Sequence, residues 1–178
     1  MKTLTNFVGQ NWLITPAALG FNEPKPANVY DQRWILVLTG VIEADLKGNS
    51  SHQWLHETLS FQPHLDGPFN DARDLYNFPT PPGSGGVWFS VEQWSPFASL
   101  SSIFDQDASD NAGFAVDVWR PTPFGQVQDV LTGQLVGNIF NGIDVDVAVR
   151  DSDAWIYRVG YNITLVGKIV FDSGFIDS

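Results

Sequence analysis

Apolar and polar residues alternate along several segments of this chain, and this period of two is the feature that most limits its fold. The segment of residues 143–150, IDVDVAVR, places all its isoleucine and valine side chains at odd positions. Successive side chains of a strand point to opposite faces, so such a segment buries one face of a sheet and exposes the other. Clear helix-length patterns with a period of 3.6 residues are missing. The sequence therefore predicts an all-β protein.

Seven segments rich in β-branched and aromatic residues are bounded by Gly, Pro, Asn and Asp, as strands are. They comprise residues 33–45, 52–62, 87–94, 113–120, 128–139, 143–150 and 154–171. We expect one antiparallel domain over residues 1–178, a β-barrel or β-sandwich of about seven to nine strands. Gly160 and Gly167 are natural points for a bulge or bend in the long last strand, which favours a barrel or a strongly coiled sandwich. Residues 63–86 are predicted to form a long loop that packs as a flap over one end of the sheet.

Matching of the apolar faces predicts two hairpins in the C-terminal part of the chain. Residues 140–142 would join 128–139 to 143–150, with Leu131, Leu135 and Ile139 facing inward. Residues 151–153 would join 143–150 to 154–171 and set Asp146 opposite Arg158 on the outer face. The aspartates of this region are therefore interpreted as an ion-pair partner, a solvated side chain and turn residues, in preference to a catalytic or metal site.

Charge and composition exclude several classes of function. The net charge of −11 and the nine scattered Lys and Arg residues would repel phosphate backbones, so nucleic acid and anionic membranes are not expected partners. The absence of cysteine excludes disulfides, a thiolate nucleophile and a thiolate metal site. No apolar run could span a bilayer and no signal peptide is recognisable, which predicts a soluble protein of unknown compartment. Phosphate-loop, nucleophile-elbow and zinc-protease motifs are also missing.

Histidines and glutamates between residues 43 and 57 form the one candidate acid–base site. A hairpin of 33–45 with 52–62 would bring Glu43 opposite the stretch from His52 to His56, where Glu57 also lies. In a helix the two histidines would suit a metal ion, whereas in a strand they lie about 13 Å apart. Alternation favours a strand, and the competing interpretation is a set of polar residues on a half-exposed sheet face.

The segment DQDASDN offers oxygen ligands for calcium at Asp105, Asp107 and Asp110. It fails the helix–loop–helix calcium pattern, because Val116 stands where the closing glutamate should be. A loop of a β-sandwich could bind calcium without that pattern, and an Asp-rich turn is the competing interpretation. No other cofactor is predicted.

Aromatic residues are abundant, with 13 Phe, 7 Trp and 4 Tyr. Trp88 and Trp94 share strand parity, as do Trp155, Tyr157 and Tyr161. A row of aromatic side chains on a concave sheet or in a barrel mouth suits a flat apolar ligand or a sugar ring. The competing interpretation is that these residues fill the core or an interface.

These patterns lead to three hypotheses of function. The first is a non-catalytic binding protein that recognises a small apolar or aromatic molecule, or a carbohydrate, through aromatic side chains. The second is a self-assembling structural subunit, a homo-oligomer, because both faces of WILVLTGVI are apolar. The third is a cofactor-free β-barrel isomerase, cyclase or hydrolase that uses Glu43, His52, His56 and Glu57 for proton transfer.

Overall fold

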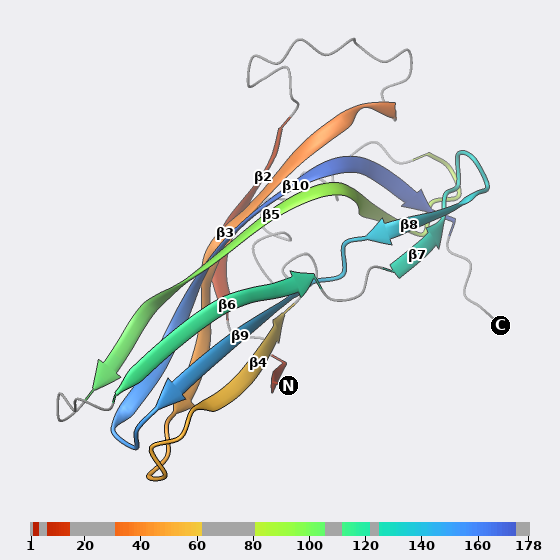
Figure 1. Ribbon diagram of the computed structural model, residues 1–178. Helices are drawn as coiled ribbons and strands as arrows, with labels where there is room; N and C mark the ends of the chain where they lie inside the picture. The colour runs from red at the N-terminus through yellow and green to blue at the C-terminus, as the bar shows by residue number, and fades with distance from the viewer. Residues whose placement is uncertain are drawn as a thin grey trace.

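Strands make up most of the protein, whose computed structural model describes residues 2–3, 7–14, 31–61, 81–105, 112–121 and 125–173. The described residues contain no α-helix, so the all-β prediction is confirmed (Figure 1). The strands are β1 (Lys2–Thr3), β2 (Phe7–Ile14), β3 (Arg33–Lys47), β4 (Leu55–Phe61), β5 (Gly86–Asp105), β6 (Gly113–Pro121), β7 (Gly125–Gln128), β8 (Leu135–Ile139), β9 (Ile143–Arg150) and β10 (Ala154–Asp172).

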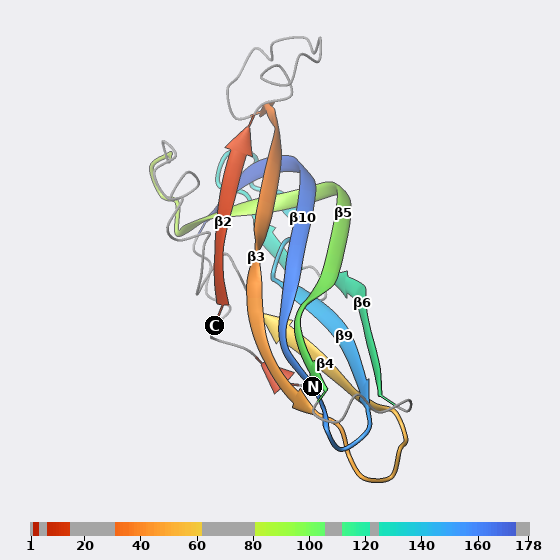
Figure 2. The ribbon, with the colours of Figure 1, turned by 90° about the vertical axis from the view of Figure 1, so that its left-hand side faces the viewer.

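Two sheets form two layers. One has the strand order β1-β4-β9-β6 and the other the order β2-β3-β10-β5-β8-β7. All pairings are antiparallel except the short parallel pairing of β1 with β4. Figure 2 shows β2, β3, β10 and β5 side by side, with β4, β9 and β6 behind them. No closed barrel is found in the described parts of the chain, because the two sheets share no ladder of hydrogen bonds.

The hydrophobic core lies between the two layers. On β9 the odd positions from Ile143 to Val149 are at most 1% exposed, which confirms the inward face predicted from alternation. The opposing β3 and β10 contribute alternate residues such as Leu38 and Leu165. Burial of such side chains supplies most of the free energy that stabilises a domain of this kind. The largest fully buried side chains are Phe61, Phe140, Phe171, Leu36, Leu38, Ile42, Leu59, Ile139, Ile143, Ile156, Ile163 and Leu165.

The predicted hairpin of residues 143–150 with 154–171 is wrong. β9 pairs with β4 and β6, whereas β10 pairs with β3 and β5, so the turn between β9 and β10 crosses from one layer to the other. Asp146 therefore accepts a hydrogen bond from Thr58 at 2.6 Å and does not lie opposite Arg158. Asp144 accepts one from Ser60. Matching of faces could not separate the two topologies, because a hairpin and a crossing both keep apolar faces toward one core.

The segment predicted as one strand over 128–139 contains a tight turn, which joins the end of β7 at Gln128 to the start of β8 at Leu135. The Asp129 carboxylate accepts hydrogen bonds from the backbone nitrogen and hydroxyl of Thr132 at 3.1 and 2.8 Å, and Gly133 has a φ of 70°. β8 then pairs with β7 and β5, not with β9. Leu131 and Leu135 are consequently 44% and 72% exposed, which contradicts their predicted inward orientation, whereas Ile139 is buried as predicted.

β2 was not among the predicted strands, and it pairs with β3 along its whole length. Residues 62–80, most of the flap predicted over 63–86, lie outside the described residues. Within the described part of the chain, no helix has the length and hydropathy needed to cross a membrane.

Candidate ligand-binding site

Three adjacent strands of the six-stranded sheet, β3, β10 and β5, are paired irregularly around Tyr157 and Arg158. Between β3 and β10, Ala44 and Asp45 together face Tyr157, because the register shifts between Ile156 and Arg158. Asp45 has a φ of 45°, the left-handed backbone conformation often found at a bulge. The register of β10 against β5 also shifts on both sides of Arg158. Bulges redirect side chains locally and are frequent beside functional sites.

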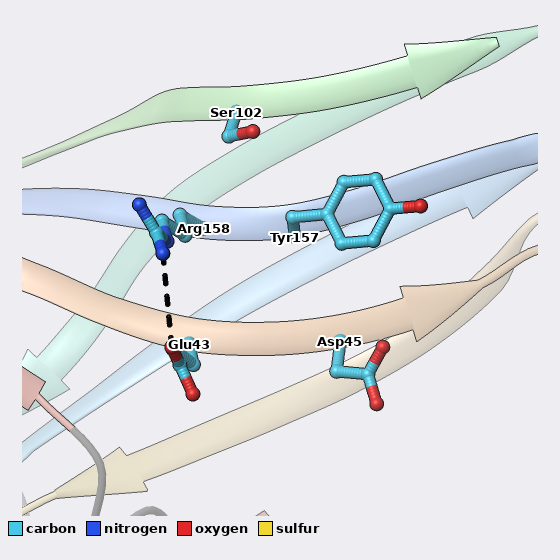
Figure 3. Close-up of a pocket in the computed structure, with 5 residues that line it drawn as sticks. All are labelled: Glu43, Asp45, Ser102, Tyr157 and Arg158. Atoms are coloured by element: carbon cyan, nitrogen blue, oxygen red, sulfur yellow. Dashed lines mark ion pairs between the residues drawn. The ribbon is translucent and has the colours of Figure 1, made fainter.

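A hollow of about 490 Å³ lies over these bulges on the outer face of the sheet. Its lining comes from all three strands: Glu43 and Asp45 on β3, Tyr157 and Arg158 on β10, and Ser102 on β5 (Figure 3). Tyr157 and Arg158 are consecutive, yet both are exposed, because Tyr157 is an extra residue of β10 in its pairing with β5 and interrupts the alternation. The hollow is open to solvent and mostly polar, which distinguishes it from an enclosed apolar pocket.

One ion pair crosses the hollow. The Arg158 Nη2 atom lies 3.9 Å from Glu43 Oε1, and both side chains are more than half exposed. An exposed pair of this kind contributes at most about 1 kcal/mol to stability. These two groups are therefore available to exchange their mutual contact for hydrogen bonds to a ligand.

Aromatic rings border the hollow. Trp155 and Tyr157 are stacked, with ring centroids 5.6 Å apart and planes inclined by 22°. Phe104 on β5 lies 6.5 Å from Tyr157, centroid to centroid, and is 44% exposed. Lys47 Nζ lies 4.3 Å from the Trp155 ring centroid, a cation–π contact. The result is a partly exposed aromatic surface next to charged hydrogen-bonding groups.

Charges around the hollow are balanced although the whole chain is strongly acidic. Glu43 and Asp45 carry two negative charges, and Lys47 and Arg158 carry two positive ones. The carboxylates can accept hydrogen bonds, and the ammonium and guanidinium groups can donate them. This arrangement suits a neutral ligand with many hydroxyl groups better than an ion.

The predicted aromatic residues separate into three groups. Tyr157 lines the hollow, and Trp155 lies beside it, stacked on its ring. Trp88 and Trp94 share parity, but they lie on opposite faces of β5, because Val91 faces Gly167 and Gln93 faces Val166, leaving Glu92 as an extra residue between them. Trp94 therefore packs against the core, whereas Trp88 lies on the outer face, between the core residues Val87 and Phe89.

Tyr161, the last predicted ligand-binding residue, is in the core. It is 3% exposed and packs against Phe61, with ring centroids 4.9 Å apart. Its hydroxyl is buried without a hydrogen-bond partner, and burial raises the pKa of this phenol well above its ordinary value of 10.0. The phenol therefore stays neutral near pH 7 and cannot contact a ligand in the outer hollow.

The Tyr161→Phe variant is expected to be as stable as the parent protein or more stable by up to about 1 kcal/mol, because it removes a buried polar group without a partner. Urea unfolding monitored by tryptophan fluorescence measures this difference. Tyr157→Phe, at an exposed ring, serves as the control and should change stability by less than about 0.5 kcal/mol. A loss of more than 1 kcal/mol in Tyr161→Phe would show that its hydroxyl is hydrogen-bonded.

The four residues of the predicted acid–base site are not brought together. β3 and β4 belong to different sheets, so Glu43 lies on the outer face of the six-stranded sheet and is not opposite His52 or His56. His56 and Glu57 are adjacent in β4, a strand as predicted, and therefore point to opposite faces. His52 precedes the strand, in a turn with a φ of 54°.

His52 contacts a residue of a second turn, Asp151. Its Nδ1 atom lies 3.5 Å from Oδ2 of Asp151, whose side chain is only 5% exposed, and the φ of Asp151 is 87°. A side chain on Gly48 would stand 1.9 Å from the Asp151 carbonyl oxygen, so the β3–β4 and β9–β10 connections are packed tightly. Asp151 lies in the turn predicted from the sequence, whereas its contact with His52 was not predicted.

Only part of the predicted calcium site can be located. Asp105 is the last residue of β5, and its Oδ1 atom is buried without a hydrogen-bond partner. Asp107 and Asp110 lie outside the described residues. Among the described residues there is no group of three or more His, Asp or Glu side chains placed to bind a metal ion.

Sequence reasoning missed Asp45, Lys47, Ser102, Phe104 and Arg158 as members of the site. For β3 the signal was present, because the odd residues Glu43, Asp45 and Lys47 alternate with apolar even residues and must share the outer face. The contributions of β5 and β10 depend on register between distant segments, which alternation does not determine. In comparisons with known proteins, no family model, curated protein or solved structure matches this chain.

Proposed function

We propose that this protein binds carbohydrate, without catalysis, at the outer hollow of its six-stranded sheet. The observation that supports this most is the stacked Trp155–Tyr157 pair beside a charge-balanced group of hydrogen-bonding side chains. A sugar ring presents an apolar face of C–H groups, which packs on an aromatic ring, and a rim of hydroxyls, which donate and accept hydrogen bonds. The aromatic pair can pack against the apolar face of the sugar ring, and the charged and polar side chains can form hydrogen bonds with its hydroxyls.

A flat apolar molecule fits this site less well than a sugar. Sites for such molecules are enclosed, mostly apolar and bury most of the ligand. The hollow is open, and four of its five lining residues are charged or polar: Glu43, Asp45, Ser102 and Arg158. An apolar ligand would strip water from these groups without replacing their hydrogen bonds, which is unfavourable.

The test is binding of the purified protein to a panel of neutral polysaccharides, followed by calorimetric titration of Trp155→Ala with the sugar that is retained. This variant is expected to lose about tenfold or more in affinity, since truncation of a central aromatic contact typically costs more than 1.4 kcal/mol. Trp54→Ala is the matched control, because Trp54 is 43% exposed, lies outside the hollow and contacts Arg150 instead.

Two results would contradict the proposal. Failure of the parent protein to bind any neutral polysaccharide would remove its basis. Equal losses in Trp155→Ala and Trp54→Ala, with unfolding curves unchanged, would show that binding does not occur at the hollow.

Self-association is a second candidate, favoured by exposed apolar residues on β5. Phe97 is 65% exposed, Ile103 49% and Phe104 44%. Exposed apolar surface often marks contacts between subunits. Light scattering during size-exclusion chromatography would support this candidate by giving a defined oligomer that Phe97→Ala and Phe104→Ala convert to monomer. A monomeric parent protein at high concentration would exclude it.

A further inference from the structure

Phe97 provides a second exposed aromatic side chain on the same outer face, well separated from the hollow. It lies opposite Asn162 of β10 and is 65% exposed, whereas its neighbour Ala98 packs against the core. Phe104 is seven positions farther along β5, and at a rise of about 3.3 Å per residue this corresponds to about 23 Å. A single sugar ring covers only a small part of that distance.

The surface between Phe97 and the hollow carries small side chains. Gly160 follows Arg158 on the outer face of β10, and it pairs with Ser99 on β5 and Val41 on β3. A side chain on Gly160 would stand 3.0 Å from the Ser99 hydroxyl oxygen. Because residue 160 is glycine, no side chain protrudes from the outer face of β10 at this position. Among the described residues, a long ligand could therefore lie along β5 and β10 from the hollow, past Gly160 and Ser99, to Phe97 without meeting a large side chain between them.

Charge restricts the kind of chain that could lie there. The four charges at the hollow cancel, and the exposed residues Ser101 and Asn162 next to this path are neutral. A polyanionic glycan would in addition be repelled by the net charge of −11 on the protein. A neutral chain with hydroxyls along its length needs no net charge at the binding surface, and the net charge of the protein does not repel it.

We infer that the ligand is a linear neutral polysaccharide that extends along the outer face of β5 and β10, with Phe97 binding a sugar unit distant from the unit at the hollow. This inference rests on the proposed function and specifies the length and charge of the ligand. A distal aromatic contact adds affinity only for chains long enough to reach it, because the second contact is then intramolecular.

The experiment compares a disaccharide and a hexasaccharide of the polysaccharide retained by the parent protein, by calorimetric titration. The parent protein should bind the hexasaccharide about tenfold or more tightly than the disaccharide. Phe97→Ala should remove most of this difference and leave the affinity for the disaccharide unchanged, whereas Trp155→Ala should weaken both. Leu131→Ala is the matched control, since Leu131 is 44% exposed in the β7–β8 turn at the other end of the molecule (Figure 1).

The outcomes separate this inference from the function on which it rests. If Trp155→Ala weakens binding but the two sugars bind equally, or Phe97→Ala binds the hexasaccharide like the parent, the site is limited to the hollow and the extended path is wrong. If neither sugar nor the polysaccharide binds, both proposals are overturned. Unfolding curves of Phe97→Ala and Leu131→Ala should match that of the parent, because both side chains are exposed.

Discussion

Replacing Phe61 by alanine is expected to lower the free energy of unfolding by about 3–5 kcal/mol, the usual cost of removing a buried phenyl ring from a core. Phe61 is the last residue of β4 and is 1% exposed. Its ring packs against Tyr161 of β10, so the contact joins the four-stranded sheet to the six-stranded sheet. Alanine would leave a cavity between the two layers, where neither sheet can collapse without moving its neighbours.

Urea unfolding followed by tryptophan fluorescence measures this loss, and Phe97→Ala is the matched control. Phe97 is 65% exposed, so its truncation should change stability by less than about 0.5 kcal/mol. Because domains of this size are stable by about 5–15 kcal/mol, Phe61→Ala should remain folded at low temperature but melt much earlier. Similar small losses in both variants would show that the two sheets do not pack through Phe61.

The strands were predictable because alternation and local composition determine them together. β9 was predicted with its observed bounds, Ile143–Arg150, and β10 within one residue at its C-terminal end, Asp172. Strand partners were not predictable in the same way. The turn at Asp151 has the length of a hairpin loop, but it connects two sheets, and the residues that determine this choice lie far away in the sequence.

The candidate site depends on bulges, which sequence signals identify unevenly. Gly167 was predicted as a bulge or bend, and the register of β10 against β5 does shift beside it. This shift, in which Glu92 is the extra residue of β5, places Trp88 and Trp94 on opposite faces. The shift at Tyr157, which creates the hollow, involves no glycine or proline, so the local sequence gives no signal for it. Parity therefore grouped Trp155 and Tyr157, whose rings are stacked, but added Tyr161, which lies beyond the bulge and faces the core.

Gly167→Ala is expected to lower the free energy of unfolding by about 3 kcal/mol, at the upper end of the usual cost of overpacking. A β-carbon at this position would stand 1.9 Å from the carbonyl oxygen of Ser90 and 3.0 Å from the Phe89 ring. The nearest atom belongs to the backbone of β5, so no side-chain rotation can relieve the overlap and the two central strands must separate. Thermal and urea unfolding measure the loss.

Gly137→Ala is the control for this substitution, because the nearest atoms to its new β-carbon would be those of Gln126 at 3.9 Å, an ordinary contact. It should change stability by less than about 0.5 kcal/mol. Parent-like stability of Gly167→Ala would mean that β5 and β10 can separate at this level without cost. The bulge beside Gly167 would then be an adaptable feature, and its position could not be what holds Trp94 on the inner face and Phe97, farther along β5, on the outer one. A large loss instead ties the register of β5, and with it the orientation of its aromatic side chains, to the absence of a side chain at residue 167.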